Sequence, residues 1–222
     1  MPLKKAPRRD GGEDAQPAEG TPERIIAAAV DTLRSVGYAG TTARAVARAG
    51  GFNQALIYYH FGSMSDLLLA CVERVSAERM ARYRESLQDI SDISEFAQAA
   101  FRLYREDMDA GHTTVLVEVI AAVLAEPSLG PQVIRLMEEW VAYAEEIIGA
   151  FLRRSPFGPM LGERELAQAV IALYMGMETL THLDGDRRRF DPLFESGLRM
   201  AQMMAPLFAA DGANKTDGGT RA

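Results

Sequence analysis

Helix start and stop signals follow one another closely between residues 42 and 62. Thr42 is a good N-cap for a short helix, and the pair Gly50-Gly51 ends that helix. Asn53 then caps a second short helix, which ends at Gly62. Two short helices joined by a tight, glycine-containing turn are the arrangement of a helix-turn-helix. This spacing constrains the fold more than any other feature of the chain.

The remaining segments also favour helices, and none shows the alternation of a strand. Thr21-Pro22-Glu23 supplies an N-cap, a proline at the first helical position and an acid at the positive end, and Gly37 ends this first helix. Further helices are expected over about 63–87, 92–110, 113–125, 131–153, 163–183 and 192–209. The sequence therefore predicts an all-α fold of about nine helices.

Composition sets the ends of the folded region and excludes several classes of protein. Residues 1–20 are rich in proline, glycine and charge, and residues 211–222 are polar, so both are expected to be disordered. We find neither a secretory signal nor an apolar run of about 20 residues that would span a membrane. Cys71 is the only cysteine, which fits a reducing cytoplasm. The three histidines lack metal-ligand spacing, and we expect no metal, cofactor or catalytic activity.

The net charge of −7 at first argues against nucleic acid, but its distribution does not. Residues 1–70 hold eight Lys and Arg against seven Asp and Glu, whereas residues 71–222 carry a net charge of −8. This asymmetry fits an N-terminal part that faces DNA and an acidic remainder.

The stretch TTARAVARAGGFNQALIYYHFGSMSDLL, residues 41–68, resembles the DNA-binding region of the TetR family of bacterial regulators. The resemblance lies in the paired threonines, the arginine two places on, the turn at Gly51-Phe52, the Ile57-Tyr58-x-His60-Phe61 core and the Ser63 cap. With the first helix it covers 21 to about 69. It implies an N-terminal three-helix helix-turn-helix domain, 21–69, and a C-terminal helical ligand-binding and dimerisation domain, 70–210.

The resemblance also implies roles for individual residues in binding operator DNA. Thr42 and Arg44 would touch phosphate and base, Gln54 and Leu56 would face bases, and Ala55 would lie near the groove floor. Tyr58 and His60 would bind phosphates, and Tyr59 could do either. Asn53 joins this set because it crowds the start of the same helix. Glutamine can pair with adenine and arginine with guanine, which agrees with these roles.

One position departs from the family pattern. The lysine and glutamate that usually follow the serine cap are replaced by Met64 and Ser65. A phosphate-binding ammonium is therefore missing, and the basic segment from Lys4 to Arg9 is a candidate to replace it along the DNA backbone.

A module of this size needs a homodimer to read a useful operator. Two apolar stripes near the C-terminus suit such an interface, and Gly176 would allow close helix approach. The stripes are Leu166, Val170, Leu173, Met177 and Leu180, followed by Leu193, Leu198, Ala201, Ala205 and Phe208. An ordinary intramolecular core explains part of the same pattern.

The middle helices are expected to enclose a small-molecule effector of apolar or aromatic character. The candidate lining residues are bulky and adaptable, although each also suits a packed core. They are Phe101, Tyr104, Met108, Met137, Trp140, Tyr143, Tyr174 and Met177. Glu118 and Glu178 interrupt apolar surroundings and would need partners. For Glu118 these are His112, Arg102, Arg105 or a cationic ligand group, with structural ion pairing as the alternative reading.

The function predicted from these features is a ligand-responsive DNA-binding transcriptional regulator, a repressor released from its operator by a small molecule. One alternative is a DNA-binding regulator, an activator or a protein-controlled factor, without a small effector. Another is a helical enzyme or interaction module with a vestigial helix-turn-helix. A well-filled interior would favour the first alternative. The Met64 departure and the acidic net charge are the only support for the second.

Overall fold

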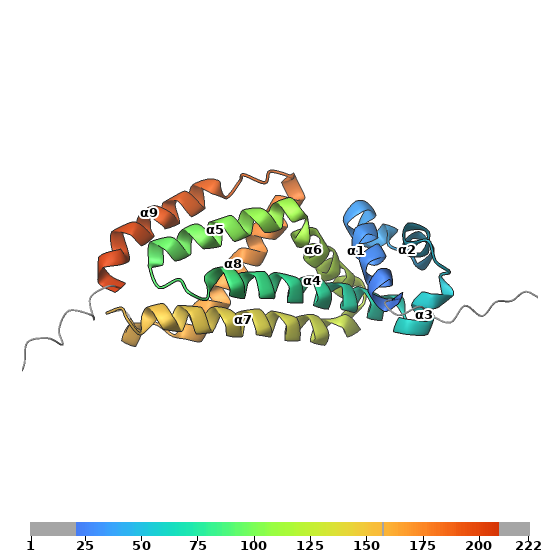
Figure 1. Ribbon diagram of the computed structural model, residues 1–222, viewed down its shortest axis with the longest axis horizontal. Helices are drawn as coiled ribbons and strands as arrows, with labels where there is room; N and C mark the ends of the chain where they lie inside the picture. Colours follow the sequence, from blue (N-terminus) through green and yellow to red (C-terminus); the bar gives the residue numbers. More distant parts are fainter. Residues whose placement is uncertain (1–20, 157, 209–222) are drawn as a thin grey trace, which may run out of the picture.

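The computed structural model describes residues 21–156 and 158–208, apart from the side chains of residues 112, 113 and 159 (Figure 1). The segments 1–20 and 211–222, which the sequence predicts to be disordered, lie outside this range. The regular elements within it are all helical, which confirms the all-α class. They are α1 (Thr21–Gly40), α2 (Ala43–Gly50), α3 (Ala55–Phe61), α4 (Met64–Leu87), α5 (Ile93–Ala110), α6 (His112–Ala125), η1 (Pro127–Leu129), α7 (Gly130–Leu152), η2 (Gly158–Met160), α8 (Glu163–Asp184) and α9 (Asp191–Phe208).

The boundaries of the short N-terminal helices follow the capping signals. Thr42 Oγ1 accepts the backbone N–H of Ala45 at 3.2 Å, and Gly51 ends α2 in the left-handed conformation at φ 66°. Ser63 Oγ accepts the N–H of Asp66 at 3.0 Å and so caps α4. In α1, Gly37 breaks the helix as expected, at φ 70°, but a further helical segment continues to Gly40.

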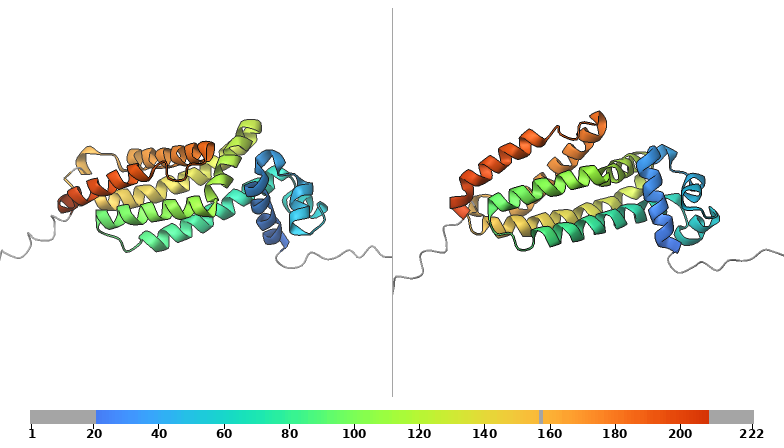
Figure 2. Two further views of the ribbon diagram at one scale, coloured as in Figure 1. Left: turned by 90° about the horizontal axis from the view of Figure 1, so that it is seen from above. Right: turned by 45° about the horizontal axis from the view of Figure 1, so that its top comes forward.

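The helices form two parts along the longest axis of the molecule (Figure 1). Helices α1, α2 and α3 gather at one end, and α4 leads from them into the other part, where α5 and α7 run lengthwise beside it. Helix α8 packs against α7 and α6, and α9 packs against α5. The further views in Figure 2 show α9 on the outside of this part, with its C-terminal end far from α1–α3.

The largest cluster of buried apolar side chains extends from the N-terminal helices into the rest of the molecule. It combines Ile25 and Leu33 of α1 and Ile57 of α3 with Val119 of α6 and Leu136 of α7. Two smaller clusters lie further along the molecule, one around Leu103 and one around Tyr104. The hydrophobic interior therefore crosses the boundary at residue 69 that the sequence suggested.

The apolar helices are short or interrupted by bends. Helix α6, the most apolar of those described, has 14 residues. Within the described ranges no single helix is long and apolar enough to cross a membrane. Two bent pairs, α3 with α4 and α5 with α6, meet the length and composition criteria when taken together.

Candidate DNA interface and ligand cavity

The helix-turn-helix presents most of the predicted DNA-binding side chains to solvent. In α2 and its N-cap, Thr42 and Arg44 are exposed. Around α3 the exposed residues are Asn53, Gln54, Ala55, Tyr58 and Tyr59. Tyr59 is 73% exposed and Tyr58 50%, so both rings are accessible to another molecule.

Two of these polar residues already have structural roles, and two do not. Thr42 Oγ1 caps α2, and Asn53 Oδ1 accepts the N–H of Ala55 at 2.9 Å. The N-cap position of α3 is Gln54 and not Asn53, and it has no side-chain capping bond. The side chains of Arg44 and Gln54 make no hydrogen bond or ion pair with other residues in the described ranges. Arg44 and Gln54 are therefore the residues best placed to contact another molecule.

Leu56 and His60 are placed differently from the rest of the predicted set. Leu56 is half-buried and packs against the largest core cluster, because it lies on the face of α3 next to Ile57. His60 is also half-buried, and its ring meets Tyr59 edge-on at 4.9 Å between ring centres. His60 Nε2 is buried without a hydrogen-bond partner in the described part of the chain.

The two residues that depart from the family pattern both connect the start of α4 to the interior. Met64 packs against the largest core cluster. Ser65 Oγ donates a hydrogen bond to Glu126, the residue that caps the C-terminal end of α6. Ser65 therefore joins the start of α4 to the end of α6.

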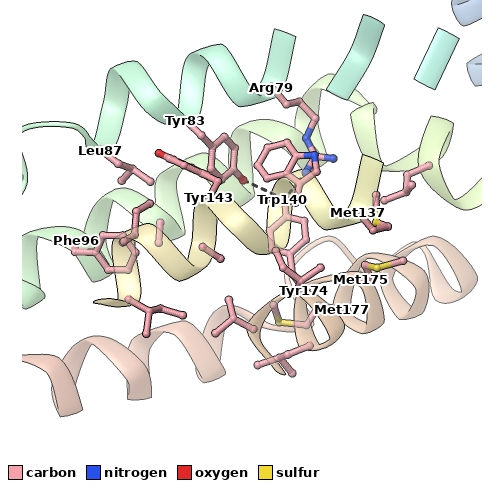
Figure 3. Close-up of a pocket in the computed structure, with 18 of the residues that line it drawn as sticks. Arg79, Tyr83, Leu87, Phe96, Met137, Trp140, Tyr143, Tyr174, Met175 and Met177 are labelled. Carbon is pink, nitrogen blue, oxygen red and sulfur yellow. Dashed lines mark hydrogen bonds between the residues drawn. The ribbon is translucent and has the colours of Figure 1, made fainter. Parts of the chain in front are cut away.

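A cavity of about 280 Å³ lies among the helices of the C-terminal part (Figure 3). Its wall is almost entirely apolar or aromatic, and six helices contribute to it. The lining residues are Arg79, Tyr83 and Leu87 of α4, Phe96 and Ala100 of α5, Leu116 of α6, Met137, Trp140, Tyr143, Ala144, Ile147 and Ile148 of α7, Val170, Ile171, Leu173, Tyr174, Met175 and Met177 of α8, and Phe194 of α9.

Five of the ten residues predicted to bind a ligand line this cavity, and five lie elsewhere. Those in the wall are Met137, Trp140, Tyr143, Tyr174 and Met177. Phe101, Tyr104 and Met108 belong instead to the core cluster between α5 and α9, where Phe101 stacks on Phe194 at 4.8 Å. They are outside the wall because their face of α5 is turned toward α9. Glu118 and Glu178 are also outside it.

Glu118 does not have the arginine partners suggested by the sequence. Arg102 is exposed, and Arg105 Nη1 pairs with Asp191 at 2.9 Å. The Glu118 carboxylate instead accepts the backbone N–H of Tyr38 at 2.6 Å and lies 3.7 Å from His182 Nε2. The prediction of an arginine partner is wrong because α6 presents Glu118 to the end of α1. The side chain of His112 is outside the described part.

A buried cluster of charges stands directly behind the cavity wall. Arg79 Nε donates to Asp107 at 2.9 Å, and Arg79 Nη2 donates to Glu178 at 3.1 Å. Arg82 also pairs with Asp107. For Glu178 the structural ion pair, the alternative reading, is therefore the arrangement found. Burial raises the pKa of Glu178 to about 7, although the Arg79 charge acts in the opposite direction.

Hydroxyl and indole groups at the wall are already hydrogen-bonded. Tyr83 and Tyr174 both donate to Asp107, at 2.9 and 3.0 Å, and Tyr174 also accepts from Arg79 at 2.9 Å. Trp140 Nε1 donates to Ser76 Oγ at 2.8 Å. Burial raises the pKa of both Tyr83 and Tyr174, so both stay protonated at neutral pH. Figure 3 shows these rings close together, between Leu87 and Phe96 on one side and Met137 on the other.

Arg79 and Tyr83 are the functional candidates that sequence reasoning missed. Both continue the buried face of α4 at helical spacing from Val72 and Val75. A charged residue on an otherwise apolar stripe was the available signal. We find no group of three His, Cys, Asp or Glu side chains suited to a metal ion in the described ranges. Burial raises the pKa of Cys71 to about 12, so its thiol is protonated.

Comparisons with known proteins agree with this geometry. The sequence profile of bacterial regulatory proteins of the tetR family matches residues 25–71. An uncharacterized HTH-type transcriptional regulator of Mycobacterium tuberculosis is 28% identical over 115 residues, which cover 51% of this chain and 58% of that relative. The chain thus spans less than two thirds of the mycobacterial protein. The HTH-type transcriptional regulator UidR of Escherichia coli is 22% identical over 190 residues, covering 84% of this chain and 91% of UidR.

Among solved structures, the fatty acid degradation regulator FadR from Bacillus halodurans superposes with a TM-score of 0.68 at 17% identity, covering 81% of this chain and 93% of FadR. At this identity the likeness concerns the fold alone. The fold and the exposed motif define a helix-turn-helix protein with a second, helical domain. The match to bacterial regulatory proteins of the tetR family over residues 25–71, together with this fold, supports a TetR-family transcriptional regulator. Its relatives are transcriptional regulators rather than enzymes.

Proposed function

We propose that this protein is a DNA-binding transcriptional repressor that a small molecule releases from its operator. One observation carries the proposal: a helix-turn-helix with the unpaired side chains of Arg44 and Gln54 shares a molecule with an apolar cavity of about 280 Å³. Arginine and glutamine can each make bidentate contacts to base edges in the major groove. Operator binding would also place the protein in the bacterial cytoplasm.

The repressor acts as a homodimer in this proposal, because one helix-turn-helix reads only one half-site. Support comes from α8 and α9, which leave large apolar side chains uncovered. These are Val170, Leu173, Leu180 and Leu183 on α8 and Leu193, Met200, Met203 and Leu207 on α9. Four of them belong to the stripes expected to dimerise. Met177 and Ala201, by contrast, are buried within the chain.

Two helices connect the cavity to the DNA-binding end. Helix α4 contributes Arg79, Tyr83 and Leu87 to the wall and starts directly after α3. Helix α6 contributes Leu116 to the wall, and its Glu118 holds the end of α1. A ligand that moves either helix changes the separation of the two recognition helices in the dimer, so they no longer match the groove spacing. By linkage, DNA weakens ligand binding by the same factor.

The alternative is a DNA-binding regulator without a small-molecule effector. A filled interior would favour it, whereas the cavity favours a ligand. The two versions share the DNA-binding surface and differ only in the use of the cavity.

The experiment that tests the proposal is binding of the purified full chain to duplex DNA from the region flanking its own gene, over a series of salt concentrations. We expect saturable binding to one pseudo-palindromic fragment and a steep decrease of affinity with salt. Equally weak binding to that fragment and to scrambled DNA would contradict specific recognition. If the operator lies elsewhere in the genome, the same binding measurement is made on genomic DNA fragments that were selected for binding to the protein.

A further inference from the structure

We propose that the cavity binds its ligand as an uncharged, predominantly apolar molecule and discriminates against organic anions and cations of the same size. This inference rests on the proposed function and specifies the chemical class of the effector. It follows from the wall of the cavity and the charges behind it.

The wall offers a ligand almost nothing but hydrocarbon and aromatic surface. Leu87 and Phe96 line one region, and Met137 and Met177 supply flexible thioethers in another (Figure 3). A charged ligand group placed among such residues would lose its hydration without a replacement. An uncharged group gains from leaving water at such a surface.

The charged side chains near the wall are already paired with one another. Arg79 is the charged residue among those that line the cavity, and it is held by the carboxylates of Asp107 and Glu178. Arg82 also pairs with Asp107. A ligand anion beside the Arg79 guanidinium would also meet the two carboxylates that pair with it, and a ligand cation would meet that guanidinium at the wall. Neither sign of charge therefore finds an unpaired counter-ion.

The hydroxyl and N–H groups at the wall that could donate hydrogen bonds to a polar ligand already donate to other residues. Tyr83 and Tyr174 direct their hydroxyl hydrogens to Asp107. The indole N–H of Trp140 is bonded to Ser76 on α4. A ligand that needs strong hydrogen-bond donors would have to break these bonds, and each broken bond would leave a buried group unpaired.

The size of the cavity limits the ligand further. Its volume of about 280 Å³ is near the lower end of the range of about 300–1,000 Å³ for small-molecule sites. A compact molecule with two fused or linked rings, or a medium-length alkyl chain, fits this space.

The first measurement uses N-phenylnaphthylamine, an uncharged fluorophore that brightens in apolar surroundings. Trp140 is the only tryptophan of the chain and lies in the wall, so energy transfer from Trp140 reports a fluorophore bound in its neighbourhood. We expect saturable transfer with the full-length protein. Absence of saturable binding would overturn the proposal.

The second measurement tests charge directly by displacing the bound fluorophore with matched eight-carbon competitors. We expect octanol to compete about tenfold or more better than octanoate and octyltrimethylammonium. A charged competitor that equals or exceeds octanol would overturn the proposal. Glu178→Gln removes one carboxylate from the cluster, so we expect it to narrow the gap between octanol and octanoate above neutral pH.

Two variants of one helix locate the binding. Ala144 of α7 lines the cavity, and Ala144→Phe should fill it and abolish transfer. Ala142 lies on the exposed side of α7, and Ala142→Phe should bind the fluorophore like the parent protein. Circular dichroism verifies that both variants are folded. Equal binding by both would overturn the assignment to this cavity.

DNA binding is measured separately, so the two proposals fail separately. If the fluorophore binds with the expected preference but leaves operator affinity unchanged, the ligand class stands and ligand-controlled release fails. If DNA is not bound specifically while the fluorophore binds, the regulatory proposal fails and the cavity assignment stands.

Discussion

The carboxylate of Glu118 accepts the backbone N–H of Tyr38 at 2.6 Å, across 80 positions of the chain. This bond joins α6 to the end of α1 immediately after Gly37, where the helix breaks at φ 70°. The same carboxylate lies 3.7 Å from His182 of α8, a helix that also lines the cavity. Glu118 therefore connects the DNA-binding end with two helices of the C-terminal part.

Replacing Glu118 with alanine should destabilise the protein and weaken the coupling between ligand and DNA. The loss leaves the Tyr38 N–H without its acceptor, which costs about 1–3 kcal/mol. Urea unfolding measures the stability, and the ratio of operator affinities with and without ligand measures the coupling. Glu118→Gln retains an acceptor oxygen, so its stability and its coupling between ligand and DNA should lie between those of the parent protein and those of Glu118→Ala. Glu139→Ala, which removes an exposed carboxylate from α7, is the control and should change neither quantity.

Arg44→Ala should weaken operator binding by about 1–3 kcal/mol if the guanidinium contacts a base. If Arg44 contacts only phosphate, affinity should decrease equally for operator and scrambled DNA, and the salt slope should fall by about one. Fluorescence anisotropy with both duplexes at several salt concentrations distinguishes the two cases. Arg199→Ala removes an exposed arginine on α9 and serves as the control. An effect as large in that variant would refute the assignment.

Glu178 should make the stability of the protein depend on pH. Its pKa is raised by burial to about 7 in the folded chain, so the folded state holds this proton more tightly than the unfolded state. The resulting stabilisation is complete below the ordinary pKa of about 4.5 and is lost as the pH rises through about 7. Glu178→Gln should remove this dependence, which amounts to at most about 3 kcal/mol.

Urea unfolding of the parent protein and Glu178→Gln at about pH 5 and about pH 8 checks this prediction. The free energy of unfolding should fall more steeply with pH in the parent. Glu139→Gln controls for the loss of an ordinary exposed carboxylate. If the free energy of unfolding changes equally with pH in the parent protein and in Glu178→Gln, the proposed binding of a proton by the buried Glu178 would be contradicted.

Leu180→Glu should shift the proposed dimer toward the monomer. Leu180 is 43% exposed on the apolar face of α8, where a buried charge would oppose association. Light scattering gives the molar mass, which we expect near twice 24.3 kDa for the parent. Leu124→Glu places the same charge on a leucine of α6 that is 82% exposed, and it should leave the mass unchanged. A parent protein with the mass of one chain would contradict the dimer.

The helices could be predicted from the sequence because their ends depend on local chemistry. Thr42, Gly51 and Ser63 act on neighbouring backbone groups, and these interactions do not require knowledge of the fold. The fixed spacing of the helix-turn-helix likewise pointed to side chains that are exposed in the structure, and their contact with DNA stays a prediction. Leu56 and His60 were the exceptions, since the side of a short helix that meets the core depends on packing against other helices.

Only half of the residues predicted to bind a ligand line the cavity, for the same physical reason. Bulky residues such as Trp140 and Phe101 have the same helical periodicity whether they line a cavity or fill a core. The difference depends on how α5 rotates toward α9, a relationship between distant segments. The partners of Glu118 and Arg79 are also distant in the sequence, so local spacing held no information about them.

The continuous interior has a consequence for the modularity of this protein. Ile25, Leu33 and Ile57 of the DNA-binding helices share one cluster with Val119 and Leu136 of α6 and α7. A fragment cut after residue 69 would expose this apolar surface to water and lose the acceptor of the Tyr38 N–H. Helices α1–α3 are thus not an independent domain that can be fused unchanged to the ligand-binding domain of another protein. A functional chimera would have to carry the facing side chains of α6 and α7 with it.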